Sequence, residues 1–388
     1  MLIGDDCLRF VSDLLFRDFR LQRTTKIMAI IGIIIYAAAI LCRISYGHPN
    51  YNKALDAPKS PSSMGDLLGF HRNLTPTQLP WLNEVTTNQF DSSHRMTIDA
   101  GTVTPKPTAI QLHDVFLAVK TTQTNHAKRL NIISKTWFQM AREQTWFFTD
   151  ANDDFYNMRL NKHLINTKCP KGHSRRALCC KMAAELITFL EHRKKWFCHF
   201  DDDNYVNIAQ LQLLLSEYDS SSLWYLGKPS VASPLEVKLS ETTDHRAQFW
   251  FATGGAGFCI SRPLVQKMAP VIRNEKLMTI SDRIGFPDDV TIGFIIEYLL
   301  KVPLTVIDEF HSHLEPLDQI PPQTFRKQIS YSYAFENNAK NVVKVDGFNE
   351  RTDPTRFLSL HCHLFPQQNS CSLKKHSGFV QKKSPLTK

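Results

Sequence analysis

The sequence predicts an α/β protein with a mixed, mostly parallel sheet flanked by helices. Short apolar runs bounded by polar residues, as expected of buried strands, alternate with segments of helical period. The four clearest runs are DVFLAVKTT, TWFFTD, WFCHFDDD and LWYLGK, which begin at Asp114, Thr145, Trp196 and Leu223. No internal repeat divides this region, so we treat residues 108–388 as one domain.

Two segments between these runs have the apolar spacing of amphipathic helices. The first spans 176–195 and has one apolar face, formed by Leu178, Met182, Leu186, Phe189 and Leu190. The second follows the acidic run and holds Leu211, Leu214 and Leu215. Asn207 is its candidate N-cap, because asparagine favours that position.

Polar residues follow three of the predicted strands. Lys120, Thr121 and Thr122 follow the first, Asp150 follows the second, and the triplet Asp201–Asp203 follows the third. In α/β sheets the ligand lies beyond the carboxyl ends of the strands. We therefore expect a binding site at this edge.

The first 107 residues differ in composition from the rest. Residues 27–42 form an uncharged apolar run of 16, which at about 1.5 Å per residue is slightly short for an average bilayer but suits thinner internal membranes. Positive residues precede this run, which predicts a signal-anchor with residues 1–26 in the cytosol and the remainder in the lumen. The alternative is a cleaved signal peptide ending near Ala37–Ala39. Residues 43–107 are polar, rich in proline and predicted to form a stem.

Cysteine usage fits an oxidising lumen. Seven of the nine cysteines lie beyond the apolar run, enough for three disulfides and one thiol, and spacing alone leaves their pairing open. The sequon at Asn73 predicts N-glycosylation there. The net charge of +9 is scattered, with local clusters only at 192–195 and 374–388, so nucleic-acid binding is disfavoured and an anionic small-molecule substrate suits the balance better.

The acidic triplet is the strongest chemical signal. In an extended chain Asp201 and Asp203 point to the same side, so a DxD pair can hold one cation. Carboxylates select Mg²⁺ or Mn²⁺, and an added imidazole moves the preference toward Mn²⁺ or a later metal. His311 and His313 follow another predicted strand and are candidates for that imidazole. The alternatives are a Lys or Arg partner or plain water beside the acids, a solvated acidic loop, and ordinary surface or core histidines.

Three further segments are candidates for the site. The glycine-rich stretch Phe249–Arg262 allows a close backbone approach but lacks the dinucleotide and P-loop motifs. Asp288 and Asp289 lie at an apparent helix start, where an N-cap is the structural alternative. Arg129 lies on an early predicted helix, where most arginines are solvated.

Taken in this order, the motifs resemble the Fringe glycosyltransferases, β-1,3-N-acetylglucosaminyltransferases of the GT-A fold. The resemblance covers about 280 residues, and no single motif decides it. It rests on DVFLAVKTT, HSRRALCCKMAAE, KWFCHFDDDNYVN, GKPS, FWFATGGAGFCISR, PDDVTIGFIIE, VPL, FHSHLE, FENNAKNVV and DPTRFLSLHCHLFP. The type II Golgi layout of this family also matches the predicted anchor and stem.

The resemblance implies a role for each matching residue. Asp203 and His313 would hold Mn²⁺, Asp202 and Arg129 would contact the nucleotide sugar, and Asp289 would be the catalytic base. On this basis Asp201 need not touch the metal. The implied disulfides are Cys169–Cys180, Cys198–Cys259 and Cys362–Cys371. Cys179 departs from the family pattern and leaves the pairing beside it open.

The implied reaction is the inverting transfer of N-acetylglucosamine from UDP-N-acetylglucosamine to the 3-hydroxyl of O-linked fucose. The implied acceptors are EGF-like repeats, notably those of Notch, whose signalling would be modulated. Rival readings are a related β-1,3-galactosyltransferase, a metal-dependent phosphohydrolase using both acidic clusters, and a catalytically silent binding module.

Overall fold

The computed structural model describes residues 110–239, 245–336 and 339–368, together with Cys371. The predicted cytosolic segment, anchor and stem, and the sequon at Asn73, lie outside these ranges. Within them, no helix is both long and apolar enough to cross a membrane.

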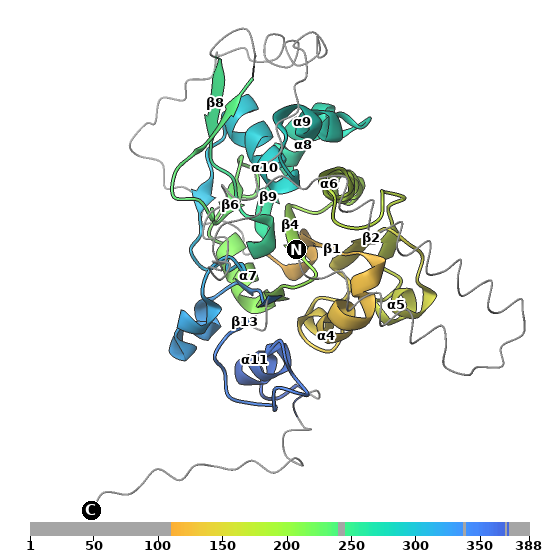
Figure 1. Cartoon of the computed structure of the whole chain (residues 1–388), viewed down its shortest axis with the longest axis vertical. Helices are drawn as coiled ribbons and strands as arrows, with labels where there is room; N and C mark the ends of the chain where they lie inside the picture. The colour runs from red at the N-terminus through yellow and green to blue at the C-terminus, as the bar shows by residue number, and fades with distance from the viewer. Residues whose placement is uncertain (1–109, 240–244, 337–338, 369–370, 372–388) are drawn as a thin grey trace, which may run out of the picture. The chain divides into compact units, whose positions relative to one another are not determined.

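The described part of the chain contains a seven-stranded sheet with the strand order β10-β6-β9-β4-β1-β2-β3 (Figure 1). Its strands are β1 Val115–Lys120, β2 Thr145–Thr149, β3 Leu164–Asn166, β4 Trp196–Asp201, β6 Tyr225–Gly227, β9 Phe258–Ser261 and β10 Thr305–Val306. Four neighbouring pairs are parallel and the two pairs formed by β9 are antiparallel. The predicted mixed, mostly parallel sheet is confirmed.

Helices cover both faces of this sheet. One layer holds α6 Arg175–Glu191, α8 Arg262–Ile272, α9 Lys276–Ile284 and α10 Asp288–Gly293. The other holds α4 Asn131–Ile133, α5 Asp154–Arg159, α7 Ile208–Leu215 and α11 Phe357–Leu364. The predicted helix 176–195 corresponds to α6 and ends four residues earlier.

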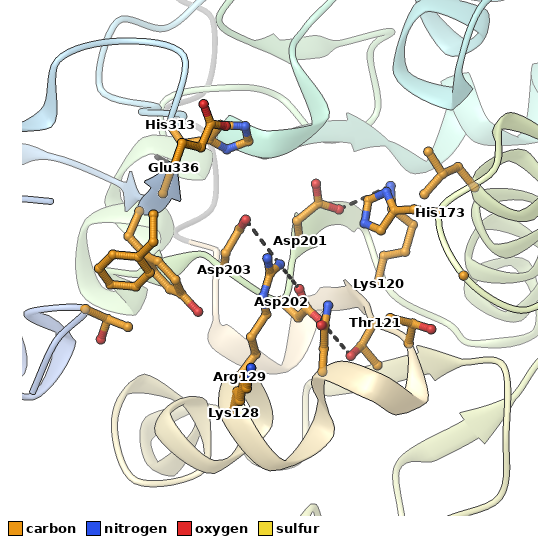
Figure 2. A pocket seen from close by; sticks show the side chains of 18 of the residues that line it. Lys120, Thr121, Lys128, Arg129, His173, Asp201, Asp202, Asp203, His313 and Glu336 are labelled. Carbon is orange, nitrogen blue, oxygen red and sulfur yellow. Dashed lines mark hydrogen bonds and ion pairs between the residues drawn. The ribbon is translucent and has the colours of Figure 1, made fainter. Parts of the chain in front are cut away.

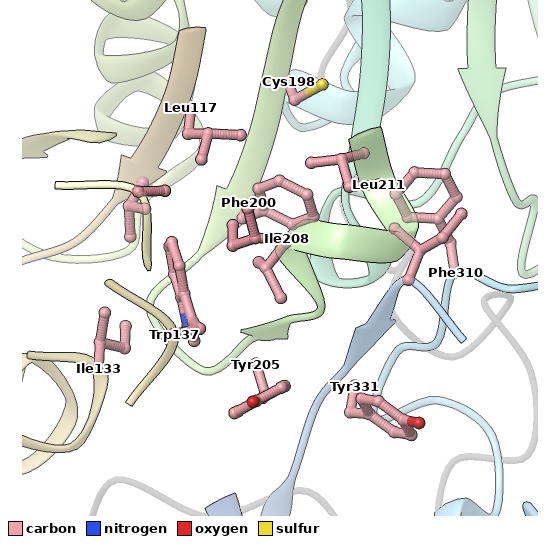
Figure 3. Close-up of a cluster of buried hydrophobic side chains, with 14 of the residues drawn as sticks. Leu117, Ile133, Trp137, Cys198, Phe200, Tyr205, Ile208, Leu211, Phe310 and Tyr331 are labelled. Carbon is pink, nitrogen blue, oxygen red and sulfur yellow. The ribbon is translucent and has the colours of Figure 1, made fainter. Parts of the chain in front are cut away.

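Strand β1 shows why the predicted strands appear in the sequence as continuous apolar runs. Its residues Val115, Leu117 and Val119 pack into the cluster on the α7 side, whereas Phe116 and Ala118 pack into the cluster on the α6 side. A strand covered on both faces needs apolar side chains in both directions. Figure 3 shows part of the α7-side cluster.

Shorter pairs of strands complete the described fold. They are β5 Tyr205–Val206 with β11 Ser330–Tyr331, β7 Leu235–Lys238 with β8 Arg246–Phe249, and β12 Ala334–Glu336 with β13 Ala339–Asn341. Asn207 lies at the N-cap position of α7, as predicted, but its side chain makes no capping hydrogen bond. Its side-chain amide donates instead to the carbonyl oxygens of Arg326 and Gln328, at 3.2 and 3.1 Å, and so holds the segment before β11.

All three implied disulfides are present: Cys169–Cys180, Cys198–Cys259 and Cys362–Cys371. Cys198–Cys259 joins the paired strands β4 and β9. Cys179 is the one unpaired cysteine among the described residues, and it is buried. Burial raises the pKa of this thiol to about 12, so Cys179 is an inert core residue at neutral pH.

Candidate active site

A cavity of about 690 Å³ opens where β1 and β4 end (Figure 2). Strand pairing places Lys120 directly beside Asp201 at this edge. The cavity is lined by Lys120, Thr121, Thr122, Asn125, Lys128, Arg129, Gly172, His173, Leu178, Lys181, Asp201, Asp202, Asp203, His313, Tyr333, Ala334, Phe335, Glu336, Pro354 and Thr355. The cavity lies at the carboxyl edge of the sheet, where the sequence analysis expects a binding site.

The acidic triplet is held in a fixed turn rather than in a solvated loop. Asp201 ends β4, and its backbone N–H donates to the side-chain oxygen of Asn204 at 2.9 Å. The amide nitrogen of Asn204 donates in turn to the Gly255 carbonyl oxygen at 2.8 Å. The turn is thereby tied to the glycine-rich segment.

Asp201 pairs with cations on the inner side of the turn. Its Oδ1 lies 3.2 Å from Lys120 Nζ and 3.5 Å from His199 Nε2. Burial alone would raise the pKa of Asp201, but the charges of Lys120 and His199 outweigh burial and lower it well below its usual range. Asp201 is therefore an ionised, neutralised member of the triplet.

Asp202 is buried and uses both oxygens in hydrogen bonds. Its Oδ1 accepts from Arg129 Nη1 at 2.5 Å, and its Oδ2 accepts from Thr121 Oγ1 at 2.7 Å and Asn125 Nδ2 at 3.0 Å. Arg129, which lies in the π-helical turn η4 His126–Leu130, also lies 5.9 Å from the centre of the Tyr333 ring. Arg129 and Asp202 thus form one unit on the cavity wall.

Asp203 is the least neutralised acid of the three. Its Oδ2 accepts from Arg129 Nη1 at 3.2 Å, and its buried Oδ1 has no hydrogen-bond partner among the described residues. Burial, together with the neighbouring charges of Asp201 and Asp202, raises the pKa of Asp203 to about 8. A free, buried carboxylate oxygen facing a cavity is suited to hold a cation.

The structure separates the two candidate histidines. His313 lines the cavity, and its buried Nδ1 has no hydrogen-bond partner among the described residues. Burial lowers the pKa of His313, which favours the neutral form that binds metals. His311 instead faces a second, smaller cavity, where its Nε2 lies 2.8 Å from Gln328 Oε1 and its Nδ1 lies 3.2 Å from Glu315.

Asn341, which the sequence did not single out, and Gly255 of the glycine-rich stretch position His313. Asn341 on β13 donates through its side chain to the His313 carbonyl oxygen at 2.8 Å. Gly255 lies under the imidazole, because a Cβ there would come within 3.5 Å of the ring. The glycine-rich segment therefore contributes a close backbone approach, as its composition predicts.

Asp289 lies near the start of α10, outside the residues that line the cavity. The helix cap is Pro287, so neither acid is the N-cap. Asp289 Oδ2 accepts from the Gly254 N–H at 3.0 Å, and its Oδ1 accepts from the Val290 N–H at 2.8 Å. Burial, then the charge of Asp288, raises the pKa of Asp289 to about 6, which suits a general base near neutral pH.

Asp288 has a different partner. Its Oδ2 accepts from Lys120 Nζ at 2.6 Å in a buried ion pair. Burial would lower the pKa of Lys120, but the charges of Asp201 and Asp288 outweigh burial and raise it well above its usual value. Lys120 is thus a permanent cation between the two acidic clusters.

Asp150, the polar residue after β2, is a structural hub rather than a metal ligand. Its carboxylate accepts from Lys181 Nζ at 2.9 Å and from the Gly172 N–H at 3.0 Å. Lys181 also donates to the Thr121 carbonyl oxygen at 2.8 Å. These bonds join β1, β2, α6 and the loop that carries His173 to the cavity.

The donor set fits a hard divalent cation. Asp203 Oδ1 and His313 Nδ1 are buried atoms that the described protein leaves unpartnered, and both residues line one cavity. No group of three or more His, Cys, Asp or Glu side chains is gathered as a metal cluster in the described part of the chain. Proteins often hold such ions by one or two side chains together with substrate phosphate oxygens and water.

Comparisons with known proteins identify the family. The sequence model of the family described as Fringe-like matches residues 110–368. The Fringe glycosyltransferase of Drosophila melanogaster is 60% identical over 275 residues, which cover 70% of this chain and 67% of that protein. The chain belongs to the Fringe-like family.

Two further relatives carry enzyme names. The β-1,3-N-acetylglucosaminyltransferase lunatic fringe of Bos taurus is 47% identical over 272 residues, covering 69% of this chain and 71% of its own. The radical fringe enzyme of Notophthalmus viridescens is 45% identical over 279 residues, covering 71% of this chain and 70% of its own. This Fringe-like chain is accordingly a glycosyltransferase.

The likeness to solved structures is weak. A glycosyltransferase involved in glycosylation of the major capsid of PBCV-1 aligns with 56% of this chain and 92% of its own at a TM-score of 0.34 and 10% identity, a likeness too weak to carry an argument.

Proposed function

We propose that this Fringe-like protein transfers N-acetylglucosamine from UDP-N-acetylglucosamine to the 3-hydroxyl of O-linked fucose on EGF-like repeats, with Mn²⁺ and with inversion at the anomeric carbon. One observation carries the proposal: the free Asp203 Oδ1 and His313 Nδ1 face the same cavity. The lunatic and radical fringe relatives are named β-1,3-N-acetylglucosaminyltransferases, which supports the sugar and the linkage.

The donor would lie in the cavity with its diphosphate beside Asp203 and His313. Bound there, Mn²⁺ would stabilise the negative charge of the departing diphosphate. Arg129, held by Asp202 and Asp203, adds a fixed positive charge on the cavity wall. Thr121 and Asn125 fix the other oxygen of Asp202, so the donor would meet a preformed wall.

Asp289 would act as the general base. It accepts the proton of the acceptor 3-hydroxyl while that oxygen attacks the anomeric carbon, and the bond from that carbon to UDP breaks. The β linkage follows because the attack comes from the face opposite the leaving group. The N–H groups of Gly254 and Val290 would hold the carboxylate in place throughout.

Transfer assays test this activity. The purified chain is incubated with an O-fucosylated EGF repeat, Mn²⁺ and either UDP-N-acetylglucosamine or UDP-galactose, and the product is weighed by mass spectrometry. We expect N-acetylglucosamine on fucose, and loss of product with EDTA that returns with Mn²⁺. Transfer of galactose would favour the rival β-1,3-galactosyltransferase. Release of UDP at the same rate without acceptor would favour a hydrolase.

We also propose that the protein is a type II Golgi membrane protein with a luminal catalytic domain, and that it modulates Notch signalling. The apolar run 27–42 and the positive residues before it support the orientation. The disulfides support an oxidising compartment. Protease protection of microsomes, read together with glycosylation at Asn73, tests the topology, and a Notch reporter assay tests the signalling role.

A further inference from the structure

A chain of buried charged side chains connects the acidic triplet with the helix that carries Asp289. It begins with Glu185 on α6, whose Oε2 lies 2.6 Å from His199 Nδ1; both side chains are 0% exposed. His199 Nε2 lies 3.4 Å from Lys120 Nζ. Lys120 Nζ then contacts Asp201 Oδ1 at 3.2 Å and Asp288 Oδ2 at 2.6 Å.

These residues come from four separate elements. Lys120 ends β1, Asp201 ends β4, Glu185 lies in α6, and Asp288 begins α10. Figure 2 shows Lys120 reaching the triplet through Asp201. The Lys120 ammonium contacts both the end of β4 and the start of α10.

Such a chain is costly to bury, and buried ion pairs are weak evidence for stability alone. They are better explained by a requirement for fixed geometry. Asp288 directly precedes Asp289, so an anchor on Asp288 also limits where the carboxylate of Asp289 can lie. The triplet is anchored by the same ammonium, because Asp201 is two residues from Asp203.

We propose that Lys120 is a positioning residue of the transfer reaction: its ammonium ties the acidic triplet to the start of α10 and so fixes the general base relative to the donor site. Glu185, which is paired with His199, adds a further negative charge near the ammonium. This inference rests on the proposed function for the role of Asp289, and it adds residues for which that function assigns no part.

The charges around Asp289 provide a second line of evidence. Burial and then the charge of Asp288 raise the pKa of Asp289, whereas the Gly254 N–H, the charge of Lys120 and the Val290 N–H lower it. Tyr225 on β6 also faces Asp289 and stays protonated, because burial raises its pKa. Removing Lys120 or Asp288 should therefore move the titration of Asp289 in opposite directions.

The test uses the full chain in detergent and the variants Lys120→Met, Asp288→Asn and the double variant. Two quantities are measured: the kinetics of transfer, and the pH titration of the Asp289 carboxyl by ¹³C NMR, assigned with Asp289→Asn. Lys181→Met is the matched control, because Lys181 is an equally buried lysine that contacts Asp150 instead of Asp288. Melting temperatures show which variants fold.

We expect Lys120→Met to lower kcat by roughly 10²-fold, the usual cost of a misplaced reacting group, with the KM for the donor unchanged. Asp289 should titrate at higher pH in Lys120→Met, at lower pH in Asp288→Asn, and as in the wild type in Lys181→Met. If Lys120→Met fails to fold, kcat in Asp288→Asn is the decisive measurement, because that variant breaks the Lys120–Asp288 contact and should lower kcat with the donor KM unchanged.

Two results would overturn the inference. One is a rise in donor KM with kcat unchanged in Lys120→Met, which would make Lys120 a donor-binding residue. The other is an Asp289 titration that does not respond to Lys120→Met or Asp288→Asn. Absence of transfer by the wild-type chain would instead refute the proposed function, and the NMR titrations would still decide whether the anchor exists.

Discussion

The two acidic clusters, Asp201–Asp203 and Asp288–Asp289, have a similar arrangement of charges. In each, one carboxylate is neutralised by Lys120: Asp201 at 3.2 Å in the first and Asp288 at 2.6 Å in the second. In each, another carboxylate lacks a cation of its own and has a raised pKa, about 8 for Asp203 and about 6 for Asp289.

The difference between the clusters lies in what surrounds the acid with the raised pKa. Asp203 faces the cavity with an unpartnered oxygen and shares Arg129 with Asp202. Asp289 accepts two backbone N–H groups and does not line the cavity. An acid with a free oxygen can bind a cation, whereas an acid held by neutral donors can exchange a proton. The comparison therefore supports the proposed division of roles, in which the first cluster would bind the metal and the second would supply the base.

The largest effect is expected from removing the proposed general base, Asp289. Asp289→Asn keeps the shape of the side chain but removes its basicity, so transfer should fall by about 10²–10⁴-fold. UDP binding, measured by calorimetry with Mn²⁺, should stay close to the wild type. An equal loss of UDP binding would show that Asp289 belongs to the donor site instead.

The second largest effect is expected from removing the two proposed metal ligands, Asp203 and His313. Asp203→Asn and His313→Ala should each weaken Mn²⁺-dependent UDP binding by at least about 10–100-fold, the range seen when residues supporting a metal are lost. Activity measured against Mn²⁺ concentration checks this prediction. His311→Ala is the matched control and should leave the Mn²⁺ midpoint near that of the wild type, because His311 faces the second cavity. A similar shift in both histidine variants would contradict the assignment.

The third effect concerns pH. Because the pKa of Asp289 is about 6 and only the ionised form accepts a proton, kcat should be steady above that pH. Below it, kcat should fall by about tenfold for each pH unit. The measurement is kcat at saturating donor, acceptor and Mn²⁺. If kcat in Asp288→Asn fell over the same acidic pH range as in the wild type, Asp288 would have no influence on the pKa of Asp289.

The smallest effect concerns stability. The folded pKa of Asp289, about 6, lies above the ordinary 3.8, so the fold disfavours the ionised form. The Asp289 carboxyl therefore adds to the free energy of unfolding at pH values below the ordinary pKa of 3.8. This contribution is lost as the pH rises through 6. Asp289→Asn should raise the melting temperature at pH 7.5 by a few degrees, about 2–4 °C for each kcal/mol gained, and should leave it unchanged at pH 4. Calorimetry at both pH values checks this.

Much of the fold could be predicted from the sequence. Strands buried on both faces must be apolar throughout, so β1, β2 and β4 appear as short continuous runs. Helix α6 is visible in the spacing of its apolar residues. The edge that holds the site followed from the polar residues after these strands, because side chains at the carboxyl ends of parallel strands meet.

Roles within the site could be predicted only in part. The resemblance selected Asp203, His313, Arg129, Asp202 and Asp289, and its three disulfides are confirmed. Alternation of side chains by itself placed Asp201 and Asp203 together on one cation. In the observed structure Asp201 pairs with Lys120 instead. The extended strand ends at Asp201, so the alternation of side chains does not continue to Asp203.

The sequence by itself determined the strand and helix segments, the acidic clusters and the cysteines, since each is a local pattern of residue types. Only the tertiary structure decided which charge neutralises which. Lys120 and Asp288 are separated by 168 positions, and Glu185 and His199 are isolated residues in a helix and a strand. Long-range ion pairs have no local signature, because their partners meet only when the sheet and its helices pack.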